Sequence, residues 1–315
     1  MAWLPDRLRT EGGEWVLEGC DIDSRELSEP FFDLSVARQL RQQPRVRRSL
    51  PLAALADLGG DRAPEPAGFL FHLSRCGSTL VSRMLSASGR FLAFAEPAIV
   101  ETVLRLKDPL GGTATRKELL QAVVQAFAGA GGNERAVVFK LTARATFDHE
   151  LITTTFPSVP CVFLYREPIE TLVSLVGVGG ERLPPGLETA GLLAASPRIV
   201  RRLRPAEFWA RVLGAQCAAA LELYHRSKPL LVNYSQLPAV VWTEIAGSFG
   251  IRFSAAELAP MQAVLGSHAK APSRPFAPDG ARKRAAATAE MRDLVDRWVQ
   301  PHYERIEALR LAAES

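Results

Sequence analysis

Short apolar runs alternate with longer amphipathic stretches from residue 68 onward. The runs that have the length of buried strands are 69–73, 91–94, 136–140, 160–165 and 229–233. Helical spacing of apolar residues follows at 79–88, after Pro97, at 116–128, at 146–154, from Pro168, at 205–225, at 236–249 and up to about 313. This alternation predicts a three-layer α/β fold, in which helices cover both faces of a mostly parallel sheet.

The first 66 residues follow a different pattern. They contain Trp3, Trp15 and the pair Phe31-Phe32, and they end in a proline-containing segment at 61–66 that is typical of a linker. We therefore predict a small N-terminal extension, residues 1–66, that packs its aromatic side chains onto a main domain at 67–315. A basic run holds Arg38, Arg41, Arg45, Arg47 and Arg48. Such a run is typical of a solvated helix face, or it binds an anionic partner.

Composition narrows the class of protein. The chain has 315 residues, of which 47% are apolar and 23% charged, and its net charge of +4 is too small to indicate nucleic-acid binding. Neither a signal peptide nor an apolar run long enough to span a membrane is evident, so we expect a cytoplasmic protein. The four cysteines are far apart and form no CxxC pair, which indicates reduced thiols rather than a zinc site or disulfides.

The segment after the first predicted strand has the chemistry of a phosphate-binding loop. It reads Ser74, Arg75, Cys76, Gly77, Ser78 and Thr79 and leads directly into a helix. A helix N-terminus offers unpaired N–H groups and the positive end of a dipole, which suit a phosphate. Glycine permits close approach of the backbone, the hydroxyls donate hydrogen bonds, and Arg75 adds a fixed charge.

Two other phosphate loops fit this segment poorly. A Walker A loop needs a leading glycine and a lysine, and both are missing. A cysteine phosphatase loop needs five residues between its cysteine and arginine, whereas six separate Cys76 from Arg83. A plain strand-to-helix turn stays open as the unspecialised interpretation.

At this point the sequence resembles the sulfotransferase family, over about residues 68–310. Arg75 to Thr79 matches the loop that grips the 5′-phosphosulfate of the donor PAPS (3′-phosphoadenosine-5′-phosphosulfate), with Cys76 in place of the usual serine. The family's second motif, which binds the 3′-phosphate, matches Arg166 at a strand end and Ser174 eight residues later. Weaker matches place Tyr234 near the adenosine and Lys283 in a basic C-terminal clamp. The resemblance implies the P-loop NTPase-like sulfotransferase fold.

The resemblance also implies catalytic residues. Glu96 lies 21 residues after Arg75, where tyrosylprotein sulfotransferases have their general base, although a glutamate before a proline is also a common start of a helix. Lys140 and Arg75 are expected to stabilise the leaving phosphate. Thr142 replaces the histidine base of cytosolic animal enzymes, and His268 is a possible substitute. We expect partial burial and a bound nucleotide to raise the proton affinity of Glu96, and the helix N-terminus to lower the pKa of Cys76 and make it reactive.

The expected activity is therefore transfer of a sulfuryl group from PAPS to an acceptor hydroxyl, with PAP as product and no metal. A kinase-like phosphotransferase and an inactive nucleotide-binding module are the alternatives on the same fold. A kinase would need an aspartate to hold magnesium, and no predicted strand ends in one. A small-molecule acceptor is slightly favoured over a protein, and the Gly- and Pro-rich segment 177–197 is expected to line its pocket.

Overall fold

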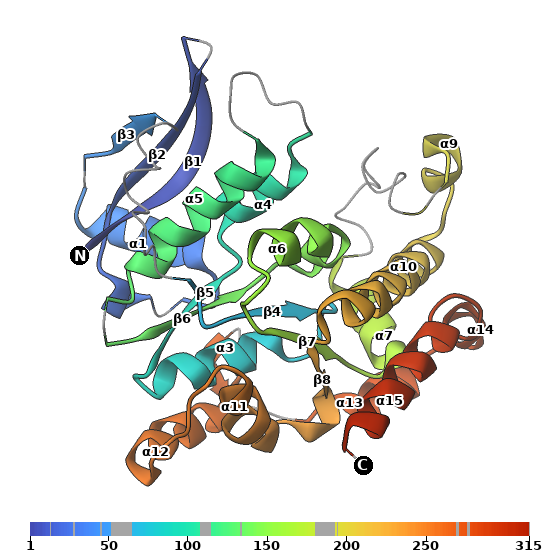
Figure 1. Cartoon of the computed structure of the whole chain (residues 1–315). Coiled ribbons are helices and arrows are strands. Elements are labelled where there is room, and N and C mark those ends of the chain that lie inside the picture. The colour runs from blue at the N-terminus through green and yellow to red at the C-terminus, as the bar shows by residue number, and fades with distance from the viewer. Residues whose placement is uncertain are drawn as a thin grey trace.

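The chain folds around a five-stranded parallel sheet (Figure 1). A computed structural model describes residues 1–12, 14–27, 29–44, 46–51, 65–107, 115–132, 134–179, 193, 195–268, 271–275 and 278–314. The sheet has the order β5-β6-β4-β7-β8. Its strands are β4 (Gly68–His72), β5 (Phe91–Ala95), β6 (Ala136–Lys140), β7 (Cys161–Tyr165) and β8 (Leu230–Asn233). These strands agree with the predicted ones to within a residue at each end.

Helices cover both faces of the sheet, as predicted. One face is covered by α3 (Ser78–Ala87), α11 (Ala246–Ser248) and α12 (Ala255–Ala263) (Figure 1). The other face carries α4 (Ala98–Arg105), α5 (Arg116–Gly129), α6 (His149–Thr155), α7 (Pro168–Gly179) and α10 (Pro205–Ser227). The described C-terminal elements are β9 (Ser267–His268), β10 (Ala271–Pro275), α13 (Gly280–Ala286), α14 (Ala289–Trp298) and α15 (Gln300–Glu314), and a short α9 (Pro197–Val200) precedes α10.

Alternating side chains of the strands fill two separate cores. Leu70 and Val162 pack with α3, whereas Phe69 and Phe163 pack on the opposite face of the sheet. Every residue of β4 and β7 is buried, as expected for central strands that are covered on both sides. Because the strands are parallel, their carboxyl ends all lie at one edge of the sheet, where α/β proteins bind their ligands.

The N-terminal extension forms a small antiparallel sheet that the hydrophobic pattern did not predict. The sheet has the order β1-β2-β3, with β1 (Ala2–Glu11), β2 (Glu14–Ile22) and β3 (Arg48–Pro51), and α1 (Phe32–Gln42) lies between its second and third strands in sequence. It packs beside α4 and α5 (Figure 1). Phe32 inserts into the main core, with its ring centroid 5.6 Å from that of Phe94 and 5.1 Å from that of Phe127.

Three arginines of the basic run form ion pairs within the extension itself, and Arg45 lies outside the described residues. Arg47 forms an ion pair with Asp6, Arg48 with Asp21 at 2.7 Å, and Arg38 with Glu29 at 3.6 Å. These pairs favour a solvated face over a site for an anionic partner. The predicted boundary at residue 66 stays a prediction, because residues 52–64 lie outside the described part of the chain.

Two predicted segments differ from the structure. The helix expected at 236–249 begins only after a cis peptide bond between Leu237 and Pro238, and it consists of a π-helical turn over Val241–Ile245 followed by α11. Proline disfavours the helical conformation at the residue before it, and Leu237 is extended with ψ of 145°, which accounts for the later start. The loop expected from residue 177 begins later too, because α7 extends to Gly179. Residues 180–192 and 194 lie outside the described residues.

No described helix combines the length and the apolar character that crossing a bilayer requires.

Phe32→Ala should destabilise the whole chain, because the side chain is 3% exposed and lies in the main core. We expect a loss of about 3–5 kcal/mol in the free energy of unfolding, measured by denaturant titration. Leu34→Ala on the same helix is the matched control, because Leu34 is 50% exposed, and it should cost less than about 0.5 kcal/mol. Equal effects of the two substitutions would contradict a shared core.

Candidate functional site

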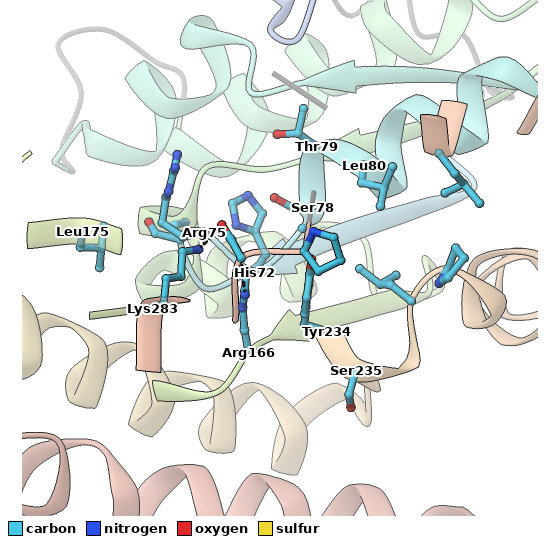
Figure 2. A pocket seen from close by; sticks show the side chains of 18 of the residues that line it. His72, Arg75, Ser78, Thr79, Leu80, Arg166, Leu175, Tyr234, Ser235 and Lys283 are labelled. Atoms are coloured by element: carbon cyan, nitrogen blue, oxygen red, sulfur yellow. Dashed lines mark hydrogen bonds and ion pairs between the residues drawn. The ribbon is translucent and has the colours of Figure 1, made fainter. Parts of the chain in front are cut away.

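A pocket of about 660 Å³ lies at the carboxyl ends of the parallel strands. Its polar walls come from segments that are far apart in the sequence, namely Ser74, Arg75, Gly77, Ser78 and Thr79 after β4, Glu96 after β5, Arg166 after β7, Tyr234 after β8, and Asp279 and Lys283 near α13. Arg75, Arg166 and Lys283 gather in one part of the pocket (Figure 2). The size and the mixture of apolar walls with a few charged groups are typical of small-molecule sites.

The loop after β4 contains two residues with a left-handed backbone, Arg75 and Gly77. Arg75 has a left-handed backbone with φ of 64°, which is unusual for a residue other than glycine. Its Nε donates to Ser174 Oγ at 2.8 Å, and no described carboxylate forms an ion pair with its guanidinium. Gly77 caps α3 with φ of 92°, and a Cβ there would lie 2.8 Å from Leu237 and 2.9 Å from Tyr234. Glycine is therefore required both by the turn and by the packing around it.

Cys76 does not face the pocket, which corrects the expectation of a reactive thiol. Its side chain is fully buried, and its Sγ donates to the carbonyl oxygen of Leu73 at 2.7 Å. Burial raises the pKa of Cys76 to about 12, and the helix N-terminus that was expected to lower it does not compensate. Cys76 can therefore contribute to ligand binding only through its backbone.

Glu96 and Lys140 form a buried ion pair at the ends of neighbouring strands. The parallel register pairs Ala95 with Lys140, and the Glu96 N–H donates to the Lys140 carbonyl at 2.7 Å. This brings the fully buried Lys140 ammonium onto the Glu96 carboxylate. Glu96 adopts φ of 53° and is, after Arg75, the second residue other than glycine in the pocket wall that has a left-handed backbone. Phe31 from the extension covers Lys140, with its ring centroid 5.1 Å from Nζ.

The charges around Glu96 oppose the expected rise in its proton affinity. Burial alone raises the pKa of Glu96, but His72 and the Lys140 ammonium outweigh it and hold that pKa at about 2. Burial lowers the pKa of Lys140, and the Glu96 carboxylate opposes that shift. His72 Nε2 lies 3.7 Å from Glu96 Oε1, and both of its ring nitrogens are within 2.9 Å of carbonyl oxygens, which fix the ring. Glu96 is therefore an ionised carboxylate in this structure.

Arg166 lies at the end of β7 and contacts two carboxylates. Its Nε donates to Glu170 at 2.7 Å, its Nη2 donates to Asp279 at 2.8 Å, and its guanidinium stacks 4.0 Å from the centre of the Tyr234 ring. Lys283 Nζ lies 2.8 Å from the other oxygen of Asp279. Ser174, which the second motif pairs with Arg166, instead accepts the hydrogen bond from Arg75. The two motifs therefore meet through Arg75 and Ser174.

The structure brings most of the predicted site residues to one pocket, with three exceptions. Cys76, Lys140 and Ser174 lie behind its wall rather than in it. The sequence reasoning missed His72, Phe31 and Asp279, all of which line the pocket. The sequence shows the Phe31-Phe32 pair but not which of the two rings faces the pocket and which faces the core. For Asp279, the only signal in the sequence is its spacing of four residues from Lys283. The side chain of His268 lies outside the described residues, and the roles of all these residues stay predictions.

Among the described residues, no group of three or more histidine, cysteine or acidic side chains is arranged to hold a metal ion.

Comparison with solved structures yields sulfotransferases. A sulfotransferase from Mycobacterium avium has a TM-score of 0.49 and 13% identity, over 84% of this chain and 81% of the other. A sulfotransferase from Alicyclobacillus acidocaldarius has a TM-score of 0.47 and 17% identity, over 78% of this chain and 96% of the other. No protein-family model and no curated protein matches the sequence.

All four cysteines should resist modification in the native protein, because each of them is buried. We expect a chromogenic disulfide reagent to label fewer than one thiol per chain at neutral pH and four after unfolding in guanidinium chloride. Rapid labelling of one native thiol, traced to Cys76 by peptide mapping, would show that the loop opens.

The Glu96 carboxylate should make stability pH-dependent. A carboxyl group whose pKa is depressed by folding stabilises the folded state above its unfolded pKa, and this contribution is lost as the pH falls through the folded pKa. Wild type should therefore lose on the order of 2 kcal/mol relative to Glu96→Gln between about pH 5 and about pH 2, as measured by urea titration. Glu134→Gln, at an exposed position, is the control and should follow wild type. Parallel curves for wild type and Glu96→Gln would contradict the ionised pair.

Proposed function

We propose that this protein is a sulfotransferase that moves a sulfuryl group from PAPS to the hydroxyl of a small-molecule acceptor. The observation that carries the proposal is Arg75. Its guanidinium lines the pocket beside the N-terminus of α3, and among the described residues it has no carboxylate partner. A half-buried cation without a counter-ion, next to the positive end of a helix, is best explained by an anionic ligand.

The residues around Arg75 fit a nucleotide with two phosphate positions. Ser78 and Thr79 lie in the first turn of α3 and line the pocket, so their hydroxyls and N–H groups suit the 5′-phosphosulfate. Arg166 and Lys283 suit the 3′-phosphate. Burial and the charges of Arg166 and Arg75 lower the pKa of Lys283, against the hydrogen bond to Asp279 that raises it. Tyr234, stacked on Arg166, offers its ring edge and hydroxyl to the adenosine.

Glu96 is the group proposed to take the proton of the acceptor hydroxyl. As that oxygen bonds to sulfur, the bond from sulfur to the bridging phosphate oxygen breaks, and PAP leaves with the electron pair. Arg75 stabilises the charge that develops on the phosphate. A carboxylate with a pKa of about 2 is a weak base, so Glu96 must be released from Lys140 for the step. Lys140 is predicted to stabilise the leaving phosphate. For this role, too, the ion pair must open, so that the Lys140 ammonium turns from Glu96 to the phosphate.

Calorimetric titration with PAP tests donor binding without knowledge of the acceptor. We expect PAP to bind without magnesium, and Arg75→Met to weaken it about tenfold or more, because a charge-assisted contact is lost. Arg297→Met, at an exposed position of α14, is the matched control and should leave PAP affinity unchanged. Binding of ATP that requires magnesium, with no binding of PAP, would instead support the phosphotransferase.

Glu96→Gln separates an enzyme from an inactive binding module. With radiolabelled PAPS and a panel of phenols and aliphatic alcohols, wild type should form sulfate esters. The variant should lose at least about a hundredfold in rate, as expected for loss of a general base, and still bind PAP. No labelled ester from wild type with any acceptor, despite tight PAP binding, would favour the binding module.

A further inference from the structure

Asp279 occupies the space between two cations that line the pocket. Its Oδ1 accepts from Arg166 Nη2 at 2.8 Å, and its Oδ2 lies 2.8 Å from Lys283 Nζ. A carboxylate that bridges two cations in this way makes the contacts that one face of a phosphate group would make. Hydrogen bonds from Lys283 and Arg166 outweigh burial and lower the pKa of Asp279, so the bridging group is ionised.

The two carboxylates that contact Arg166, those of Glu170 and Asp279, differ in how far they are buried and in whether they face the pocket. Glu170 lies on α7 one turn after Arg166, its side chain is 6% exposed, and it does not line the pocket. Asp279 lines the pocket, and its side chain is 30% exposed. Glu170 therefore holds Arg166 in place from behind, whereas Asp279 contacts Arg166 from the side that a ligand would approach.

Helix α13 is anchored independently of Asp279. Asp279 precedes the helix, but its side chain does not cap the helix N-terminus. Gly280 packs directly on the Glu170 carboxylate, where a Cβ would lie 2.9 Å from its oxygen, and Arg284 forms an ion pair with Glu170. The Asp279 side chain can therefore turn away while these two contacts keep Lys283 beside Arg166.

We propose that Asp279 is an internal counter-anion that occupies the Arg166–Lys283 subsite until a phosphate group of the ligand replaces it. This rests on the proposed function, in which that group is the 3′-phosphate of PAPS or PAP. Asp279 then determines specificity. After the exchange, a phosphate group neutralises the charges of Arg166 and Lys283. The 3′-hydroxyl of AMP is neutral, so it does not displace Asp279, and AMP obtains no binding free energy from this subsite.

The test compares PAP with AMP, which differ in the 3′-phosphate alone, by calorimetry on wild type, Asp279→Asn and Lys283→Met. Asp279→Asn should tighten PAP about tenfold and leave AMP within about twofold, because a charge that competes with the phosphate is gone. Lys283→Met should weaken PAP about tenfold. Asp293→Asn, at an exposed position of α14, removes the same charge elsewhere and should change neither affinity.

Opposite signs for the two substitutions distinguish exchange from a structural bridge. If Asp279 only held Lys283 in place, both substitutions would weaken PAP, and that result overturns the proposal, as does an unchanged PAP affinity in Asp279→Asn. Inorganic phosphate is titrated into the same proteins, because its binding needs no adenosine. Failure of wild type to bind PAP overturns the proposed function. In that case, tighter phosphate binding by Asp279→Asn still supports the exchange, and unchanged phosphate binding overturns it.

Discussion

Parallel pairing of the five central strands is the constraint on which the rest of the structure depends. The parallel register pairs Ala95 of β5 with Lys140 of β6, so Glu96 and Lys140 lie side by side at the ends of the two strands. The contact between them depends on this strand pairing and not on the local sequence around either residue. The same pairing places Arg75 and Arg166 at the ends of the adjacent strands β4 and β7. Each strand ends where its apolar run ends, and charged residues follow at that point. The parallel strands that stabilise the fold therefore also bring these charged residues together at one edge of the sheet.

The charges at this edge are arranged so that nearly every buried one is compensated inside the protein. Lys140 is paired with Glu96, and Arg166 with Glu170 and Asp279. Removing one partner from such a pair leaves a buried charge without compensation, which is why these groups persist as pairs rather than as isolated ions. Arg75 departs from this arrangement among the described residues, and it does so on a strained backbone. Strain and an uncompensated charge at one residue are both costs that a bound anion would offset.

The sequence was informative where one physical cause dominates. Runs such as 91–94 are apolar throughout and therefore predict buried strands. The turn at Gly77 could likewise be predicted, because its small and polar residues come directly after the first predicted strand. The N-terminal sheet could not be predicted in this way, because charged residues interrupt its strands and its apolar residues alternate only weakly with polar ones. The prediction for Cys76 was wrong because the side chain points inward, where its thiol contacts the Leu164 carbonyl of a neighbouring strand, and the local sequence does not show this tertiary contact. Asp279 was missed because its importance depends on Arg166, which is more than a hundred residues away in sequence.

Because Phe31 and Phe32 are adjacent in the sequence, the packing of the core and the shape of the pocket cannot evolve independently. Consecutive residues at the start of α1 serve different needs, since Phe32 fills the core between Phe94 and Phe127 while Phe31 borders the pocket above Lys140. A substitution that shifts α1 to improve packing therefore also moves an aromatic wall of the pocket. Selection for thermal stability and selection for ligand preference therefore act on two adjacent residues of the same backbone segment.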